Sequence, residues 1–201
     1  IPLLDALVKY IPSPADRPFP NRNSDKESEP VVASSDGPTA AYVWKTVADP
    51  VAGRLTMFRV VSGTLKADAT VHNLTKDAAE RCGSLLLLQG KTHTPVDELR
   101  AGDLGAVAKL KDTHTGDTLA DKGGSIKLPP FSFPSPVLSY AIEPKSRGDE
   151  EKISTSLQRL REEDPTIEYK RDDQTQELLL SGQGQLHIEV TVAKLKRRFG
   201  V

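Results

Sequence analysis

The proline-rich segment LPPFSFPSP, residues 128–136, constrains the fold more than any other feature of the sequence. Each of its four prolines lacks a backbone N–H and disfavours helical conformation at the residue before it. No regular helix and no central strand can therefore run through this segment. We expect a hinge here and a boundary between two domains, because the sequence pattern also changes at this point.

Between about Thr39 and Lys127 the chain consists of strand-length apolar runs separated by turn residues. The runs are AAYVWKTVAD, GRLTMFRVVSG, ATVHNL, CGSLLLLQG and DLGAVAKLKD. Short strands at this spacing are typical of a β-sandwich or a β-barrel. RLTMFRVV has apolar residues on both faces, which favours a closed and partly covered barrel. Residues 62–71, SGTLKADATV, are typical of a hairpin.

After the prolines the pattern is mixed. VLSYAIEP predicts a strand, and TIEYKRD with QELLLSG predicts a strand pair. Between them, residues 148–164 predict an amphipathic helix with Ile153, Leu157 and Leu160 on one face. Acidic residues stand at its start and Pro165 follows its end, as the helix dipole and the chemistry of helix ends favour.

The segment that begins near Gln185 is ambiguous from its pattern alone. Residues 186, 188, 190 and 192 are apolar and alternate with polar residues, as in a strand. Ile188, Val192, Leu195 and Phe199 also form a helical stripe. Periodicity leaves both structures open.

The N-terminal part contains a short helical stripe and then a polar stretch. Apolar residues at 3, 4, 7 and 8 predict a helix over residues 3–10, and residues 21–37 predict a linker or mobile loop. No apolar run approaches the ~20 residues that span a bilayer, and the leader lacks the features of a signal peptide. The single cysteine, Cys82, excludes a disulfide framework and fits a reducing cytoplasm.

Three stretches contain residues typical of catalytic or ligand sites, and each also has a structural interpretation. The GKT of LLLLQGKT, residues 85–92, resembles a phosphate-binding loop, but Leu85 stands where that motif needs glycine. Asp103, Asp112, Asp117 and His114 suggest a metal site, yet these aspartates fall in turns, where aspartate binds local backbone. We predict no metal site, and the four histidines of the chain lie far apart in sequence.

The third stretch is LLLSGQGQLHIEV, residues 178–190. Its glycines could precede a helix that binds phosphate, and His187 with Glu189 could act as an acid and a base. In a helix these two side chains would point to opposite sides, and no nucleophile accompanies them. The residues favour a tight junction between a strand and the next element.

Basic residues cluster only locally, because the net charge of the 201-residue chain is −1. The run KLKRRF contains Lys194, Lys196, Arg197 and Arg198. It could contact RNA phosphates or form a solvated helix end.

Several long motifs, taken together, resemble the translational GTPases. DPVAGRLTMFRVVSGTL, AGDLGAVAKLKDTHTGDTL, FPSPVLSYAIEPKSRGDEEKI, LQRLREEDPTI and LLLSGQGQLHIEV occur in the order seen in that family. The whole chain is similar to the middle of bacterial elongation factor G or a close elongation factor G-like paralogue. The resemblance implies a mixed fold: a β-barrel, domain II of the family, followed by an α+β ferredoxin-like domain, domain III.

The resemblance also implies the domain limits. Residues 1–36 correspond to the tail of the GTP-binding domain and a linker, 37–130 to domain II and 131–201 to domain III. A helix begins near Gln185, and the last strand of the ferredoxin-like unit follows Val201 in the family. We therefore expect that about ten further residues would raise the melting temperature of domain III. The chain contains no P-loop, no Asp-x-x-Gly motif and no Asn-Lys-x-Asp motif, so we expect no catalytic residue, metal or cofactor within it. GTP and magnesium would belong to the full-length parent, a ribosome-dependent GTPase.

The resemblance also implies a role for six residues of domain III. Gly182, Gln183, Gly184, Gln185, His187 and Lys194 correspond to the segment that faces the GTP-binding domain beside the fusidic acid pocket. This chain departs from the family pattern at three of these positions. Gln183 replaces methionine, Gln185 replaces glutamate, and Lys194 stands where arginine is usual. Lysine cannot reproduce the bidentate contact of a guanidinium group.

The implied function is ribosomal. The parent would couple GTP hydrolysis to movement of tRNA and mRNA during protein synthesis in the cytoplasm, in contact with small-subunit RNA and a ribosomal protein and with no membrane. The residues expected to contact ribosomal RNA are Arg54, Arg59, Lys66, Lys196, Arg197 and Arg198. Two alternatives remain: a ribosome recycling or tetracycline-resistance-type protection factor, and a stand-alone ribosome- or RNA-binding module.

Overall fold

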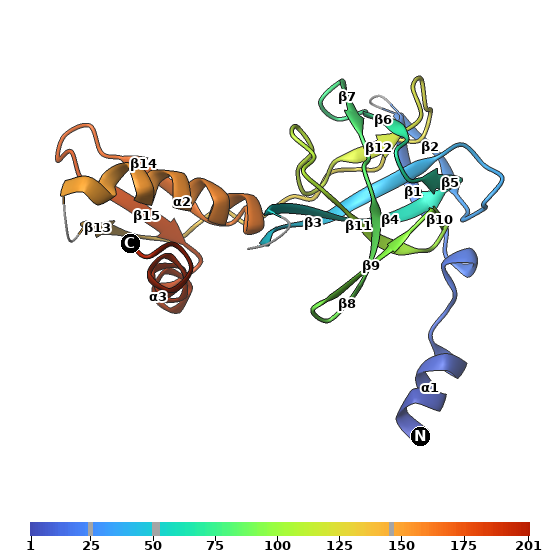
Figure 1. Ribbon diagram of the computed structural model, residues 1–201, viewed down its shortest axis with the longest axis horizontal. Coiled ribbons are helices and arrows are strands. Elements are labelled where there is room, and N and C mark those ends of the chain that lie inside the picture. The colour runs from blue at the N-terminus through green and yellow to red at the C-terminus, as the bar shows by residue number, and fades with distance from the viewer. Residues whose placement is uncertain (24–25, 50–52, 145–146) are drawn as a thin grey trace. The chain divides into compact units, whose positions relative to one another are not determined.

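The computed structural model describes residues 1–23, 26–49, 53–144 and 147–201 (Figure 1). The chain divides into two compact units, residues 1–131 and 132–201. The division falls inside the proline-rich segment. No helix in the described part of the chain is long and apolar enough to cross a membrane.

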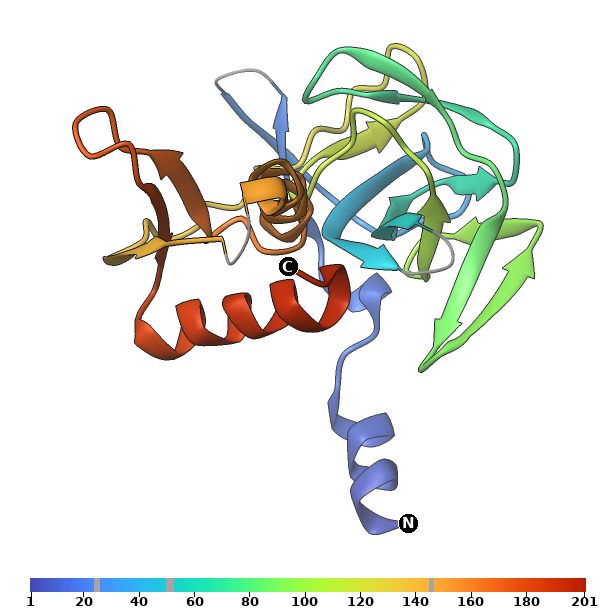
Figure 2. The same cartoon turned by 60° about the vertical axis from the view of Figure 1, so that its left-hand side comes forward.

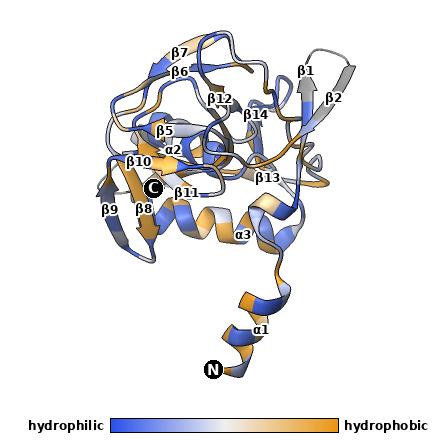
Figure 3. Cartoon of the chain, turned by 90° about the vertical axis from the view of Figure 1, so that its right-hand side faces the viewer, coloured by the Kyte–Doolittle hydropathy of each residue, from blue (hydrophilic) through white to orange (hydrophobic). Residues whose placement is uncertain are grey.

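The first unit begins with the helix α1 (Pro2–Tyr10) and the short helix η1 (Pro14–Asp16). The helix predicted over residues 3–10 is confirmed, but α1 buries none of its residues. Apolar and polar residues alternate along it in Figure 3. The prediction of a linker over residues 21–37 is partly wrong, because the strands β1 (Phe19–Asn23) and β2 (Lys26–Val31) pair there as an antiparallel ladder. Backbone groups make a ladder, so polar composition does not exclude one.

The main sheet of this unit has eight antiparallel strands. In spatial order they are β7 (Ala78–Arg81), β6 (Thr70–Asn73), β12 (Thr118–Ala120), β3 (Ala40–Asp49), β4 (Gly53–Ser62), β11 (Leu104–Ala108), β8 (Leu85–Gln89) and β9 (Thr92–Val96). Two further strands, β5 (Thr64–Lys66) and β10 (Glu98–Arg100), pair with each other. No ladder among the described residues joins β7 to β9, so the strand order is open rather than a closed ring.

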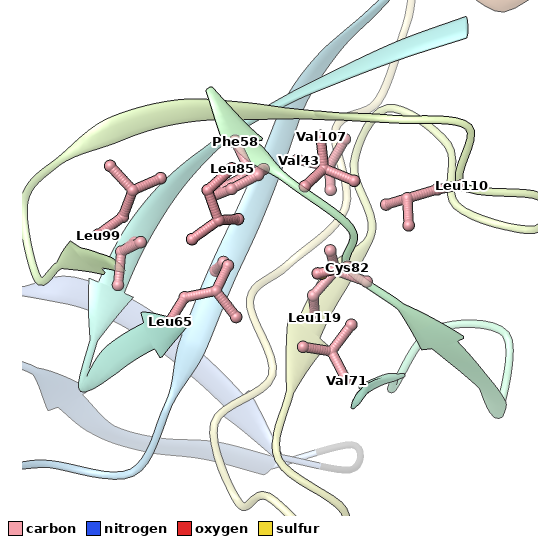
Figure 4. Close-up of a cluster of buried hydrophobic side chains, with 12 residues drawn as sticks. Val43, Phe58, Leu65, Val71, Cys82, Leu85, Leu99, Val107, Leu110 and Leu119 are labelled. Carbon is pink, nitrogen blue, oxygen red and sulfur yellow. The ribbon is translucent and has the colours of Figure 1, made fainter. Parts of the chain in front are cut away.

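One hydrophobic cluster unites these strands. Phe58 of β4, Val71 of β6, Leu85 of β8 and Leu99 of β10 are among its members, and each is at most 2% exposed (Figure 4). Strands from both halves of the sheet therefore surround one core. The expectation of many short strands around one core is confirmed, but the ladders of the described residues do not show the closed barrel that was expected.

The predicted hairpin at residues 62–71 is wrong. β5 pairs with β10, whereas β6 pairs with β7 and β12. Asp68 turns the chain between them in a left-handed conformation, with φ of 58°. The two runs thus enter different ladders, which the local sequence pattern does not specify.

The second unit follows the order β-α-β-β-α. Its elements are β13 (Leu138–Ile142), the turn η2 (Arg147–Asp149), α2 (Glu150–Glu163), β14 (Glu168–Arg171), β15 (Leu178–Gly182), α3 (Gln185–Lys194) and the π-helical turn η3 (Leu195–Phe199). The antiparallel sheet has the order β13-β15-β14. This confirms the predicted strands, the helix and the strand pair. Figure 2 shows α3 from the side.

The core of this unit lies between its two helices and the sheet. Ile153, Leu157 and Leu160 of α2 are buried together with Leu180 of β15 and Ile188 of α3. The helical periodicity of the last segment is therefore the correct one. Tertiary packing decides between the two patterns, because the helical stripe faces this core.

Candidate functional site

The turn between β15 and α3 is built by close approach of backbone and side chains. Gly182 ends β15, and Gly184 is the N-cap of α3. A Cβ atom on Gly182 would lie 3.0 Å from Nδ1 of His187 and 3.2 Å from Cγ1 of Ile188. Glycine is needed at 182 because the first turn of α3 packs directly against it.

His187 holds this turn through both ring nitrogens. The backbone N–H of Gln183 donates to Nδ1 at 3.1 Å, and Nε2 lies 3.0 Å from Oδ2 of Asp164. Because an amide N–H can only donate, Nδ1 must be the acceptor, and the proton of a neutral ring is on Nε2. His187 therefore donates to Asp164 and connects the turn to the end of α2.

Asp164, the C-cap of α2, is a carboxylate with several donors. Burial alone would raise its pKa, but hydrogen bonds from the Thr166 hydroxyl and backbone N–H and from His187 outweigh burial and lower the pKa. The group is ionised at neutral pH. Together, Asp164 and His187 make a structural hydrogen-bonded pair at the rim of the core.

The two glutamines of the turn have different partners. Gln183 donates from Nε2 to the carbonyl oxygens of Pro134, at 3.1 Å, and Ser135, at 3.0 Å. Gln185 donates to Glu189 within α3 at 2.8 Å. The backbone N–H of Gln183, which a bound phosphate would need, is already bonded to His187. This arrangement favours a structural junction over a phosphate cradle.

The basic run at the C-terminal end is divided among different surroundings. Arg198 donates to Glu163 of α2 at 2.7 Å and lies over the ring of Phe199. Lys196 lines a hollow of about 450 Å³ between β13 and α3, and Arg197 is exposed. Lys194 is half-buried. The four cations therefore do not form one continuous basic face.

The three cations predicted in the first unit are also dispersed. Arg54 and Arg59 lie on β4 at positions of opposite parity, so their side chains leave opposite faces. Arg54 donates to the carbonyl oxygens of Lys111 and Thr113. Lys66, at the end of β5, is exposed. Arg54 thus has a role in fixing the loop that follows β11.

A buried polar cluster in this unit was missed by sequence reasoning. Glu80, only 7% exposed, accepts the backbone N–H groups of Lys111, at 2.5 Å, and Asp112, at 3.2 Å, and the Thr113 hydroxyl. Asn73, fully buried, donates to Asp117 at 2.9 Å. No sequence signal marks Glu80, because AAER resembles an ordinary exposed strand.

The other two candidate stretches have structural roles. Gly90 and Lys91 form the turn between the paired strands β8 and β9, where Gly90 has φ of 60°, and no helix follows them. Asp103 accepts the backbone N–H of Arg100 at 2.8 Å, and Asp117 accepts that of His114 at 2.8 Å. The described residues contain no group of three or more potential metal-ligating side chains. The turn interpretation of these aspartates agrees with this geometry.

Comparison with known families identifies both units. Residues 38–122 match the model of elongation factor G domain 2, and residues 133–201 match that of elongation factor G domain III. The chain carries domains II and III of elongation factor G. A crystal structure of a protein from Thermus thermophilus matches all of this chain with 30% sequence identity and a TM-score of 0.80. Our chain spans 28% of the length of that one.

The candidate residues fall within the two matched domains. Domain II of elongation factor G contains Arg54, Arg59, Lys66 and the Glu80 cluster, and domain III contains the turn at residues 182–187. Neither matched family is the GTP-binding domain. The two matched families account for residues 38–122 and 133–201 of the chain.

Proposed function

We propose that this chain is the domain II and domain III part of a ribosomal translocase, a GTPase of the cytoplasm. The observation that carries the proposal is the presence of both family domains, adjacent and in the family order. GTP and magnesium would bind in another domain of the parent. Hydrolysis there would change how domains II and III are held against the small ribosomal subunit and would drive tRNA and mRNA forward by one codon.

The proposed RNA contacts can be ordered by how exposed each basic side chain is and by whether it already has a partner within the fold. Lys66, Lys196 and Arg197 are exposed and are the strongest candidates for phosphate contacts. Arg54 and Arg198 already have partners within the fold, so their first role is structural. Arg59 is half-buried on the sheet. Contact with ribosomal RNA through Lys66 would be sequence-independent and sensitive to salt.

The salt dependence of ribosome binding tests these contacts. Each neutralised phosphate releases counterions, so replacing Lys66 or Arg197 by alanine should lower the slope of log K against log salt by about one. Lys9 on α1 provides a matched control at a position outside the proposed contacts. A slope unchanged in Lys66→Ala and Arg197→Ala would exclude these residues as phosphate contacts.

The turn at residues 182–187 is proposed to face the GTP-binding domain of the parent. Gln185 and Leu186 are its exposed residues, Gln183 and Gly184 are half-buried, and Gly182 is buried. His187 holds the turn from within, and Lys194 lies at the far end of α3. The rigid support of this turn by Asp164 is what an interface that transmits a change in the neighbouring domain requires.

The translocase activity itself is tested by a toeprint with the full-length parent, GTP and a pre-translocation ribosome. Forward movement by one codon is the expected result. Ribosome-stimulated GTP hydrolysis without movement would indicate a recycling or tetracycline-resistance-type protection factor. The replacement of the family methionine and glutamate by Gln183 and Gln185 keeps that second candidate open. Ribosome or RNA binding without any GTP hydrolysis would indicate a stand-alone binding module.

A further inference from the structure

Trp44 is the single tryptophan of the chain, and it lies exposed at an irregular point of β3. The register of β3 against β4 shifts between Val43 and Lys45, and Trp44 is the residue that this register skips. A β-bulge at such a shift re-aims a side chain and is frequent next to binding sites. The side chain is 41% exposed, although tryptophan is among the side chains that gain most from burial. Domain II therefore presents a large aromatic surface to solvent at this point.

The loop between β11 and β12 is attached to β3 on both sides of Trp44. The backbone N–H of Gly116 donates to the carbonyl oxygen of Val43 at 2.8 Å. The backbone N–H of Thr46 donates to the Thr115 hydroxyl at 3.1 Å. The exposed tryptophan and this loop therefore lie side by side.

Exposed cations accompany the tryptophan along the same two stretches of chain. Among the described side chains of this part of β3 and of the loop, the exposed lysines are Lys45, Lys109 and Lys111, and the exposed carboxylate is that of Asp112. Three ammonium groups against one carboxylate make the surface positive, although the net charge of the whole chain is −1. Such a surface is complementary to a polyanion.

The loop is held in place from its buried side. Glu80 accepts the backbone N–H of Lys111 at 2.5 Å, and Arg54 donates to the carbonyl oxygen of Lys111 at 2.8 Å. The backbone N–H of Lys109 donates to the carbonyl oxygen of Arg54 at 2.8 Å. Lys109 also has φ of 66°, a left-handed conformation that favours glycine, and strain of this kind is frequent at ligand sites. The two loop lysines thus extend from a fixed backbone, which needs little ordering when a ligand binds.

We propose that Trp44, Lys109 and Lys111 bind a single-stranded stretch of RNA, with an unpaired base stacked on the indole ring and neighbouring phosphates at the two ammonium groups. The inference rests on the proposed function, because it names the kind of ribosomal RNA that domain II contacts. An indole ring stacks on any base, and lysine binds phosphate without regard to sequence. The site therefore recognises unpaired RNA rather than a particular base sequence. Arg54 is a positioning residue in this site, because its guanidinium group bonds the loop.

The fluorescence of Trp44 reports the stacking directly, because no other tryptophan contributes. The probe is a short oligoadenylate, added to the whole chain at low salt, and we expect it to quench the indole emission. An oligomer of the same length with the sugar–phosphate backbone but no bases is the matched control ligand, and it should leave the emission unchanged. Absence of quenching by the oligoadenylate would overturn the proposal, and so would equal quenching by both oligomers.

Substitutions separate the stacking from the phosphate contacts. With a labelled oligoadenylate followed by anisotropy, Trp44→Ala should weaken binding by about tenfold, whereas Trp44→Tyr, which keeps an aromatic ring, should weaken it much less. Lys111→Ala should lower the slope of log K against log salt by about 0.7, as expected for one phosphate of a single strand. Lys109→Gly should do the same, and glycine suits the left-handed backbone at that position. Lys91→Ala, on the exposed turn between β8 and β9, is the control and should change neither quantity. Wild-type slopes in both loop variants would overturn the proposal.

Binding of the full-length parent to small ribosomal subunits separates this inference from the proposed function. We expect Trp44→Ala and Lys111→Ala to weaken that binding, and Lys91→Ala to leave it unchanged. Ribosome binding at wild-type affinity in Trp44→Ala and Lys111→Ala would overturn the inference and leave the proposed function intact. A wild-type parent without affinity for ribosomes would contradict the proposed function itself, whereas quenching of Trp44 by oligoadenylate would still support the RNA site.

Discussion

Domains II and III place their polar groups differently. In domain II, Asn73 and Thr113 are fully buried, and Glu80 and Asp117 are nearly so. In domain III, the pairs His187–Asp164 and Arg198–Glu163 lie at the rim of the core. Among the described residues, domain II therefore buries carboxylates inside, whereas domain III buries only the neutral hydroxyls of Ser156, Ser181 and Thr191 and holds these pairs at its rim.

The difference follows from how each domain satisfies its backbone. Between β11 and β12 the chain of domain II runs through irregular, partly buried backbone, whose N–H groups need external acceptors. Glu80 supplies acceptors for Lys111 and Asp112, and Asp117 supplies one for His114. The helices of domain III satisfy their own interior bonds and need partners only at their ends, where Asp164 and the Gly182–Gly184 turn lie.

The prediction with the largest expected effect on stability is to open a cavity in the core of each domain in turn. Phe58→Ala in domain II and Leu157→Ala in domain III each remove a fully buried side chain. We expect losses of about 3–5 kcal/mol and about 2–5 kcal/mol of unfolding free energy, respectively. Denaturant unfolding, followed by a probe in each domain, should show the loss only in the domain that carries the change.

Val190→Ala is the control, because Val190 on α3 is 44% exposed and its truncation should cost less than about 0.5 kcal/mol. If Phe58→Ala destabilised both domains equally, the division into two separately stabilised units would be contradicted.

The second test removes the buried acceptor of domain II. Glu80→Ala leaves the N–H groups of Lys111 and Asp112 and the Thr113 hydroxyl without their acceptor, at a cost of about 3 kcal/mol. Thermal unfolding of domain II measures the loss. Glu98→Gln changes a half-buried glutamate paired with the exposed Arg100 and should alter stability by less than about 1 kcal/mol. Equal effects of the two changes would show that burial of Glu80 is unimportant.

The sequence predicts features that depend on local pattern. The prolines at 128–136 locate the division between units, and the spacing of Ile153, Leu157 and Leu160 predicts α2. The sequence does not predict features that depend on long-range pairing. An example is the pairing of β5 with β10, in a register that places Thr64 opposite Arg100 and Lys66 opposite Glu98. The sequence also does not predict that Glu80 is buried. Its carboxylate oxygens accept hydrogen bonds from a loop that is distant in sequence, and that loop lies against Glu80 only in the folded domain.

The turn at residues 182–187 shows the same limit within the candidate site. Its glycines predict close approach, and the structure confirms a tight junction at Gly182. The partners of His187 and Gln183 lie 23 and 48 to 49 residues away in sequence, at Asp164, Ser135 and Pro134. Only the folded domain reveals that His187 accepts a backbone N–H at Nδ1 and bonds Asp164 through Nε2.

The third test concerns the rim of domain III and is smaller. The pKa of Asp164 is lowered in the fold, so its carboxylate stabilises the domain above the pKa of an unfolded aspartate, about 3.9, and this contribution is lost as pH falls through the lower folded value. Asp164→Asn should lower stability by about 1 kcal/mol or less at pH 7, since the group is partly exposed.

Melting temperatures of domain III measured from about pH 7 to about pH 2 follow this effect. The difference between wild type and Asp164→Asn should shrink below about pH 4, whereas domain II should show no matching change. A difference that stays constant over the whole range would mean that ionisation of Asp164 contributes nothing to domain III.

The last prediction needs no further substitution and uses Cys82 as a probe of domain II in the two cavity variants. Burial, and secondly the charge of Glu80, raise the pKa of this thiol to about 12. A raised folded pKa means that the protonated thiol stabilises domain II below the unfolded value of about 8.5, and that this stability is lost as pH rises from there toward the folded value.

Because the thiolate is the reactive form, Cys82 should react with a thiol reagent at about pH 8 only when domain II opens. Phe58→Ala should therefore accelerate labelling strongly, whereas Leu157→Ala should leave the rate unchanged. Acceleration by Leu157→Ala would reveal that opening of domain III exposes the core of domain II, and the two ways of placing polar groups would then stabilise one cooperative unit.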